Sequence, residues 1–259
     1  MAEQNLMQER LGLANWEEYL ELDVNPQTYQ DWIDSPLGGW ETKQAAHVDL
    51  PKLLEAYKRF LIKKGIYQEK ALFYEDLQFE HEKVYWKEIV ADKLIFCEGI
   101  ASIQNPFFNW LPFKAVKGEI LDVEIKGNHL ENIINQGIFI LANQSDSFRV
   151  GATYHYQSLD AQITEEGRQE LSQKLDKMLK LPYRITGQKG GIRPATRDRR
   201  PFIGLHPDYK QLGIFGGMGA KGVSLCPYYA NHFYEHIELG KPLDKEVNIM
   251  RAAKTNHKH

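Results

Sequence analysis

Cysteine is scarce in this chain: Cys97 and Cys226 are the only two among 259 residues. Two cysteines so far apart do not form the dense set of bridges that holds small secreted domains together, so we expect reduced, buried thiols. No apolar run approaches the roughly 20 residues that a membrane-spanning helix needs. The first ten residues are polar, unlike the apolar segment of a secretory signal. These features predict a soluble, cytoplasmic protein.

An excess of charge of one sign is also missing, because 32 Lys and Arg residues oppose 35 Asp and Glu residues, a net charge of −3. A general nucleic-acid-binding protein carries a marked basic excess, so the composition offers no support for that class. Apolar residues make up 42% of the chain and aromatic residues 12%, which is enough for a sizeable core. The length fits one large domain or two interleaved ones.

Hydrophobic periodicity predicts two helices before the C-terminal part of the chain. The first follows Asp49, which can cap it, and ends before Gly65. The second follows Thr164, which can cap it in the same way. Its apolar face, at the spacing of a helix lying on a sheet, consists of Leu171, Leu175, Met178 and Leu179.

Runs with strand composition outnumber the helices and occur in clusters. They cover residues 71–79, 84–86, 93–97, 114–125 with a bend at Gly118, 137–141, 149–156 and, later, 213–215. Clustered strands with few helices favour an α+β fold with a large mixed or antiparallel sheet.

A glycine-rich segment joins the last of these strands to a final helix that we expect over 223–239. It reads Gly216-Gly217-Met218-Gly219-Ala220-Lys221-Gly222-Val223. Backbone N–H groups in such a turn, with the positive end of the helix dipole, form a site for a phosphate, a carboxylate or an electron-rich heterocycle oxygen. The alternative is a tight strand-to-helix turn that needs glycine only for positive φ.

Arginine is concentrated in the segment 191–204, which prolines interrupt and which also contains Asp198. The four arginines are Arg193, Arg197, Arg199 and Arg200. A buried arginine here could bind a substrate carboxylate, because the planar guanidinium matches a carboxylate with two parallel hydrogen bonds. The alternative is a solvated loop in which Asp198 pairs with its arginine neighbours.

One pattern of metal ligands occurs. His232 to His236 matches the His-x-x-Glu-His pattern of inverted zinc peptidases. Such a site needs another acidic ligand well downstream, and only 23 residues follow His236. The stretch also lies within the expected C-terminal helix. We therefore predict no metal site.

Two linked segments resemble the C-terminal signature of the D-amino-acid oxidase/glycine oxidase family. These are Gly-Ile-Arg-Pro-Ala-Thr-Arg-Asp from residue 191 and Gly-Gly-Met-Gly-Ala-Lys-Gly-Val from residue 216. The resemblance implies that Arg193 binds the substrate carboxylate over the flavin of FAD. It also implies that the backbone of the loop contacts the pyrimidine edge of the flavin, through Gly217, Met218, Gly219, Ala220, Lys221, Gly222 and Val223.

Weaker elements occur in the same order as in the family. The segment 96–100 resembles the strand end that approaches the cofactor, which implies that Glu98 and Gly99 lie at FAD. The segment 111–119 resembles the strand that enters the substrate domain, and 149–153 resembles the stretch after it. The match covers roughly residues 40–240.

Members of this family open with a strand, then Gly-x-Gly-x-x-Gly and a helix, which hold the FAD pyrophosphate. We find no such element: Leu11-Gly12-Leu13-Ala14 and Gly38-Gly39-Trp40 have the wrong surroundings. The resemblance then implies a substrate domain over 1–40 and 106–187. It implies the remainder of a Rossmann-like FAD-binding domain, without its first βαβ unit, over 41–105 and 188–259. The chain is then a fragment, or another chain supplies the missing FAD segment, or FAD is no longer bound.

Three functions follow as expectations. The first is FAD-dependent oxidation of a small-molecule amine or amino acid, in the manner of glycine oxidase. The second is oxidation of carboxymethylaminomethyl-uridine in tRNA, because 195–198 and 224–227 also resemble the oxidase half of a bifunctional tRNA-modifying enzyme; the acidic balance argues against it. The third is a truncated, cofactor-free binding remnant. We expect no membrane partner in any of these cases.

Overall fold

The computed structural model describes residues 18–21, 29–36, 38–127, 130, 132–156 and 160–253. The chain divides into two compact units. Unit 1 comprises Met1–Arg59, Glu119–Thr153 and Ile163–Lys189, and unit 2 comprises Phe60–Gly118, Tyr154–Gln162 and Gly190–His259. The segment 11–14 considered above lies outside the described residues. Among the described helices, none is long and apolar enough to cross a membrane.

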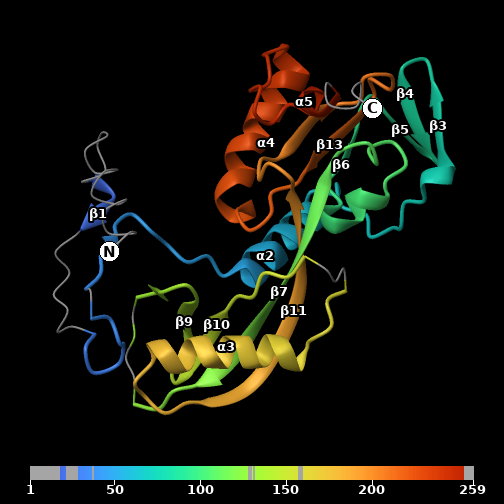
Figure 1. The fold of residues 1–259 in the computed structure, drawn as a ribbon. Coiled ribbons are helices and arrows are strands. Elements are labelled where there is room, and N and C mark those ends of the chain that lie inside the picture. The colour runs from blue at the N-terminus through green and yellow to red at the C-terminus, as the bar shows by residue number, and fades with distance from the viewer. Residues whose placement is uncertain are drawn as a thin grey trace. The chain divides into compact units, whose positions relative to one another are not determined.

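The main sheet has five strands in the order β11-β7-β10-β9-β8 (Figure 1). β10 pairs antiparallel with β7 on one side and with β9 on the other, and β8 pairs antiparallel with β9. The bounds are Phe113–Glu124 for β7, Ile134–Asn135 for β8, Phe139–Gln144 for β9, Ser147–Gly151 for β10 and Arg184–Thr196 for β11. β7 and β11 are long strands, and each contributes residues to both units.

In unit 1, helix α3 (Glu165–Met178) lies across one face of this sheet (Figure 1). Alternate residues of a strand point to the same face of the sheet, and residues four apart lie on the same side of a helix. The apolar side of α3 can therefore pack against an apolar face of the sheet. The predicted apolar face of α3 is confirmed, with Leu171 and Leu175 fully buried. The buried sheet residues of the same cluster include Leu121, Val123, Phe148 and Val150.

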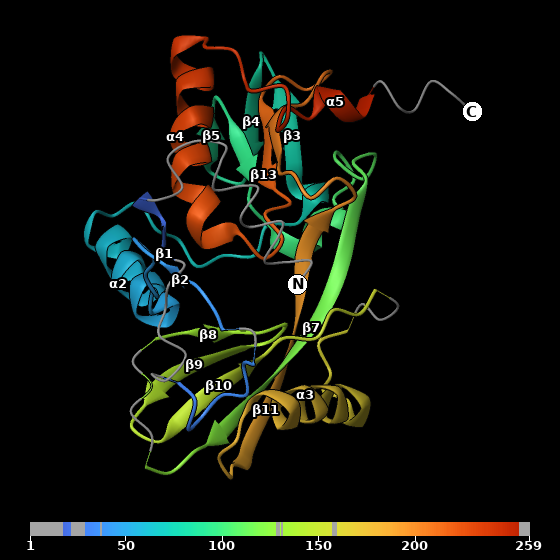
Figure 2. The same cartoon turned by 60° about the vertical axis from the view of Figure 1, so that its left-hand side comes forward.

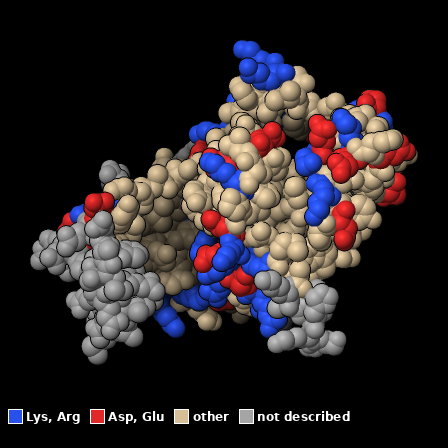
Figure 3. Space-filling model, turned by 90° about the horizontal axis from the view of Figure 1, so that it is seen from above, with Lys and Arg blue, Asp and Glu red and all other residues tan. Residues whose placement is uncertain are grey.

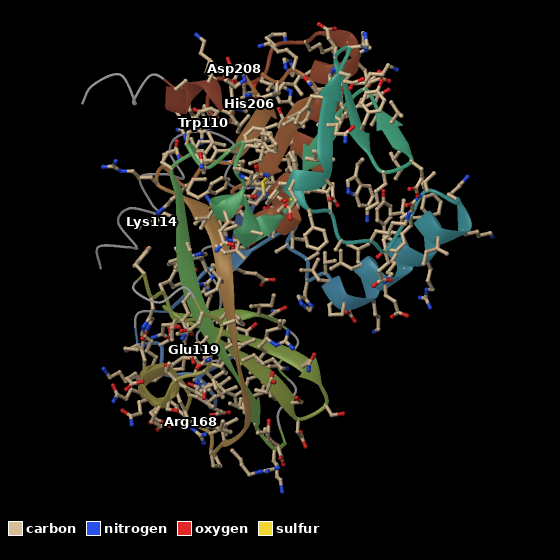
Figure 4. The ribbon with its side chains drawn as sticks, turned by 90° about the vertical axis from the view of Figure 1, so that its right-hand side faces the viewer. Trp110, Lys114, Glu119, Arg168, His206 and Asp208 are labelled. Carbon is tan, nitrogen blue, oxygen red and sulfur yellow. The ribbon has the colours of Figure 1, made fainter. Side chains whose placement is uncertain are left out.

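Glu119 joins β7 to the start of α3. Its carboxylate, in a residue only 1% exposed, accepts hydrogen bonds from Thr164 N (2.9 Å), Thr164 Oγ1 (2.7 Å) and Gln188 Nε2 (2.7 Å). Thr164 Oγ1 in turn accepts from Gly167 N at 3.0 Å, which confirms the predicted cap. A negative charge therefore lies at the positive end of the helix dipole. Figure 4 labels Glu119 and, in the first turn of α3, Arg168.

Unit 2 contains two three-stranded sheets. In the first, β13 (Leu212–Gly216) pairs antiparallel with β12 (Phe202–Leu205) and parallel with β6 (Leu94–Phe96). The second is an antiparallel meander. Its strands are β3 Leu77–Glu80, β4 Lys83–Trp86 and β5 Ile89–Ala91, and two short 3-10 helices, η3 Tyr74–Asp76 and η4 Gly99–Gln104, flank this part of the chain.

Helix α4 (Gly222–Leu239) lies beside β13 in unit 2 (Figure 2). Its Phe233 is buried in a cluster with Ile203 of β12 and with Val247. A larger cluster, rich in aromatic rings, includes Phe96, Phe108, Phe202, Leu212 and Ile249. The short helix α5 (Met250–Ala253) contributes Ala252 to it.

The first predicted helix is confirmed as α2 (Leu50–Lys63). Lys52 N donates to Asp49 Oδ1 at 3.2 Å, as a cap does, and Gly65 has the left-handed φ of +70° that ends a helix. In unit 1, β1 (Leu20–Glu21) and β2 (Glu41–Thr42) form a short antiparallel pair. Gly38 lies in a turn, where its N–H donates to Ser35 O at 3.0 Å.

Several predicted strands differ from the observed ones. The run 71–79 contains η3, and a strand begins only at Leu77; the run 149–156 ends as a strand at Gly151. The segment 191–204, weighed above as a solvated loop, is largely strand, because β11 extends to Thr196 and β12 begins at Phe202. β11 is half-exposed along much of its length, so it lacks the apolar alternation that identifies a strand in a sequence.

The two units have different bounds from the two predicted domains. Residues 106–118 and 154–162 belong to unit 2, and residues 41–59 belong to unit 1. Two of the unit boundaries fall inside continuous strands, at 118/119 in β7 and at 189/190 in β11, where composition does not change. The assignment of one unit to substrate and the other to FAD stays a prediction.

His206 is buried in unit 2 and acts as a hydrogen-bond acceptor. Its Nδ1 accepts from Asp208 N and Tyr209 N, both at 3.1 Å, and its ring packs against Phe108 and Trp110. Figure 4 shows His206, Asp208 and Trp110 in one region of the unit. Burial lowers the pKa of His206 below its ordinary value of 6.5.

We therefore expect the free energy of unfolding to fall as pH drops below about 6.5. The unfolded chain takes up a proton at the ordinary histidine pKa and the folded chain does not, so acid favours unfolding until the lower folded-state pKa is passed. Urea unfolding at about pH 7.5 and about pH 5.5 measures this loss. His206→Asn keeps a short acceptor for both N–H groups and should show a smaller loss; an equal loss in both proteins would contradict the assignment.

Candidate functional site

The parallel strands β6 and β13 bring two predicted cofactor segments to one edge of a sheet. Leu94 lies beside Leu212 and Phe96 beside Ile214, so both strands end on the same side. The residues that follow them are 97–99 and 217–223. Ligands of α/β sheets bind outside the carboxyl ends of parallel strands. The sheet therefore places both segments where a ligand is expected.

The glycine-rich loop is fastened to the end of β11. Gly219 N donates to Pro194 O at 3.1 Å. Gly217 has φ of +76°, and a Cβ there would lie 2.5 Å from Thr196 Cγ2. Both its conformation and its lack of space therefore require glycine. A backbone hydrogen bond and a close contact therefore hold the loop against the strand that carries Arg193 in unit 2.

Helix α4 begins directly after the loop without a side-chain cap. Its first backbone bond runs from Leu225 N to Lys221 O at 3.0 Å. The N–H groups of Gly222, Val223 and Ser224 come before it, so they have no carbonyl partner within the helix. With the helix dipole, they form a binding place for an anion or for a carbonyl oxygen of a heterocycle.

Two of the predicted loop donors are already used within the protein. Gly219 N donates to Pro194 O, and Lys221 N donates to Met218 O at 3.0 Å. The role of the loop in cofactor binding stays a prediction. Because these two N–H groups are already used, we expect a cofactor to bind to the other backbone N–H groups of the loop, those of Gly217, Met218, Ala220, Gly222 and Val223.

Glu98, the other predicted cofactor residue with a side chain, is engaged in unit 2. Its carboxylate accepts from Tyr74 OH at 2.7 Å and from Asn105 Nδ2 at 2.8 Å. Burial, and then the hydrogen bond to Glu98, raise the pKa of Tyr74 to about 12. Gly99 has φ of +58° with open space around it. Because the Glu98 carboxylate is already hydrogen-bonded within the protein, we expect the backbone of this segment, not that carboxylate, to contact FAD.

Arg193 lies in β11 and is half-buried. Its Nη1 donates to Lys117 O at 3.4 Å, and its Cζ lies 4.3 Å from the centre of the Tyr154 ring. Gly118 approaches the end of the guanidinium so closely that a Cβ would lie 2.2 Å from Nη1. A backbone carbonyl, an aromatic ring and a glycine thus surround the cation proposed for carboxylate binding.

Among the described residues, Asp198 forms no ion pair with the arginines beside it, which was the alternative considered for this segment. It pairs with Arg251, 53 residues along the chain, with Nε 2.9 Å from Oδ2. It also accepts from Arg200 N at 3.1 Å. Although burial opposes it, the hydrogen bonds of Asp198, first that from Arg251, lower the pKa of its carboxyl. This aspartate therefore stabilises the turn after β11.

His232 and His236, the pattern considered for zinc, each contact the chain after α4. His232 Nε2 accepts from Asp244 N at 3.0 Å, and His236 Nδ1 lies 2.7 Å from Lys241 O. In the part of the chain that the structure describes, no group of three or more His, Cys, Asp and Glu residues could hold a metal ion.

The thiols of Cys97 and Cys226 are both free. The prediction that they are buried is wrong for Cys97, which is exposed, and Cys226 is only partly buried. The reason is their position: Cys97 is the first residue after β6, at the sheet edge described above, and Cys226 lies near the start of α4. Burial raises the pKa of the Cys226 thiol.

Sequence reasoning missed two residues that contact Arg193. Gly118 was interpreted only as a bend, although a glycine inside a strand often marks a close approach by another group, which was the available signal. Tyr154 carries no such signal in the sequence. Its contact depends on the register between the segment after β10 and β7, which is a long-range property.

The family of this chain is identified by comparison with known proteins. The family described as FAD dependent oxidoreductase (DAO) matches residues 2–235. The chain belongs to this family. The glycine oxidase of Bacillus licheniformis is 31% identical over 151 residues, which cover 57% of this chain and 41% of that enzyme.

Solved structures agree on the fold of this DAO-family chain. Glycine oxidase from Bacillus cereus superimposes with a TM-score of 0.77 at 20% identity, over 94% of this chain and 71% of that one. Iminodiacetate oxidase from a Chelativorans species gives 0.72 at 20% identity, over 94% and 70%. The predicted α+β class is confirmed.

FAD is the cofactor of the family, in agreement with the sequence prediction. The described residues fit the flavin part of FAD on two counts. The α4 N-terminus has no side-chain cap, and Gly217 forms a turn that a Cβ would fill. A flavin pyrimidine edge offers the carbonyl oxygen and ring nitrogen that such backbone donors bind.

Proposed function

We propose that this chain carries the carboxylate-binding and flavin-binding parts of an FAD-dependent oxidase of small amines, amino acids or N-substituted glycines. The observation that supports it most is the hydrogen bond from Gly219 N to Pro194 O at 3.1 Å. It fixes the loop to the residue next to Arg193. The cation proposed to bind a carboxylate and the backbone donors proposed to bind a flavin oxygen are therefore held together by a direct hydrogen bond.

FAD, when bound, supplies the two-electron acceptor. The residues of the chain orient the substrate, because two N–H groups of Arg193 bind its carboxylate and so fix the direction of the α C–H bond. The substrate loses a hydride from its α carbon and releases a proton from its nitrogen to water, and hydrolysis of the resulting imine gives a carbonyl product and an amine. No side-chain base is required when the amine binds uncharged, so the protein contributes orientation and electrostatics.

The names of the relatives favour this substrate class. One is a glycine oxidase and another an iminodiacetate oxidase, and both of those compounds carry an amine beside a carboxylate. The free thiols of Cys97 and Cys226 fit a reducing compartment, and on that ground we place the enzyme in the cytoplasm.

We expect FAD-loaded protein to oxidise glycine or N-methylglycine and to leave methylamine or dimethylamine almost untouched, because each second compound lacks the carboxylate that Arg193 would bind. Reduction of a dye, measured with and without oxygen, detects turnover with either electron acceptor. Equal rates with and without the carboxylate, or no turnover by protein that retains its flavin, would contradict the proposal.

The tRNA alternative has less support. Positive and negative side chains are intermixed on the face shown in Figure 3, and the net charge is −3, so a broad basic surface is not seen there. Tight tRNA binding that weakens steeply with salt would favour that substrate instead.

A further inference from the structure

We infer that Gly118 and Tyr154 are positioning residues that hold the Arg193 guanidinium in the orientation in which it receives a planar carboxylate. The inference rests on the proposed role of Arg193. It adds two residues that act through Arg193 and determine how well the site binds an anion.

Gly118 leaves a space that the guanidinium fills. A Cβ on Gly118 would lie 2.2 Å from Nη1, 2.3 Å from Nη2 and 2.4 Å from Cζ of Arg193. Gly118 is not among the glycines with positive φ, so its backbone does not require glycine. The reason for glycine here is therefore the space that Arg193 occupies. Gly191, two residues before Arg193, also lacks positive φ but has nothing within 4 Å of its Cβ position.

Tyr154 covers the guanidinium with its ring. Arg193 Cζ lies 4.3 Å from the ring centre, well inside the range of a cation–π contact. Tyr154 is 58% exposed, so burial of apolar surface does not explain its place. Two residues on, Tyr156 makes a similar contact with Lys114 Nζ at 4.4 Å, which provides a matched control away from Arg193.

The segment that carries Tyr154 is fixed to β7 next to Gly118. Lys117 N donates to His155 O at 2.8 Å, and His155 N donates to Lys117 O at 2.9 Å. The side chain of Lys117 is buried and pairs with Asp160 at 3.1 Å. The same Lys117 carbonyl accepts from Arg193 Nη1 at 3.4 Å, so one peptide group connects the tyrosine segment to the guanidinium.

These contacts restrain the guanidinium in rotation as well as in place. A guanidinium carries its N–H donors in a rigid plane, so it can bind a carboxylate through two parallel N–H bonds when the direction of that plane is fixed. In variants without the Tyr154 ring or without Gly118, Arg193 keeps its charge, but its N–H groups no longer point in a fixed direction. We therefore expect weaker binding of carboxylates rather than loss of the fold.

The first experiment reads Arg193 directly, without flavin or turnover. In a ¹⁵N-labelled protein, the Nε–H signal that Arg193→Lys removes should be shifted upfield by the ring current of Tyr154. Tyr154→Phe should keep the shift, and Tyr154→Leu and Gly118→Ala should change it. Gly191→Ala and Tyr156→Leu should leave it unchanged. Titration with sodium acetate should show affinity about 2- to 30-fold lower in Tyr154→Leu, the range expected for a cation–π contact.

The second experiment measures kinetics of FAD-loaded protein with N-methylglycine. Tyr154→Leu should raise KM by a similar factor and change kcat less, Tyr154→Phe should restore KM, and Tyr156→Leu should resemble the wild type. Acetate affinity unchanged in both Tyr154→Leu and Gly118→Ala would overturn the inference, and so would an equal loss in Tyr156→Leu. Absence of turnover in the wild type would count against the proposed function alone, because the acetate titration would still decide the positioning role.

Discussion

Replacing Arg193 by leucine is expected to lower kcat/KM for amino-acid substrates by about 100-fold or more. A hydrogen bond to a charged group contributes about 1.5–3 kcal/mol, and two of them reach the roughly 3 kcal/mol that such a loss requires. The retention of FAD should not change, because the loop donors lie on the backbone. Steady-state kinetics and the visible spectrum of the variant measure the two quantities.

Arg197→Leu is the matched control, because Arg197 belongs to the same arginine-rich segment but is exposed beyond the end of β11. It should keep most of the activity. The slow oxidation of an amine without a carboxylate should be equally slow with and without Arg193. If Arg193→Leu and Arg197→Leu lose activity to the same extent, the assignment of the carboxylate to Arg193 is wrong.

Replacing Glu119 by alanine is expected to lower the free energy of unfolding by about 3 kcal/mol or more. The buried carboxylate accepts from Thr164 N, Thr164 Oγ1 and Gln188 Nε2, and its loss leaves these donors without that acceptor. It also removes a negative charge from the N-terminus of α3. Urea unfolding gives the change, and hydrogen exchange at the Thr164 amide locates it.

Glu165→Ala is the control, since Glu165 lies in the first turn of the same helix but is exposed. Surface substitutions of this kind change stability by about 0.5 kcal/mol or less. A loss below about 1 kcal/mol in Glu119→Ala would mean that water replaces the carboxylate without much cost.

The helices of this chain could be predicted because their signals are local. Asp49 and Thr164 each cap a helix within three residues, and Gly65 ends one, so a short window of sequence contains each boundary. The loop at 217 could be predicted for the same reason, since its glycines serve a turn between adjacent elements.

Strand β11 and the neighbours of Arg193 could not be predicted in the same way. β11 is polar and half-exposed, and what makes it a strand is its place beside β7, which depends on residues about 70 positions away in the chain. The contact of Tyr154 with Arg193 depends on the pairing of the segment after β10 with β7, which is also a long-range property. The motif predicts Arg193 as the carboxylate-binding cation, and only the fold shows Gly118 and Tyr154 beside it.

Flavin binding by the purified chain is the most direct test of the proposed site. The backbone donors described above would bind the flavin ring, so we predict that both FAD and riboflavin bind. The visible bands should be shifted from those of the free flavin and should persist through gel filtration in a buffer that contains FAD. Addition of acetate should shift these bands further in the wild type and not in Arg193→Leu. A colourless protein after incubation with either flavin, or the same acetate response in both proteins, would contradict a flavin site with Arg193 as its carboxylate receptor.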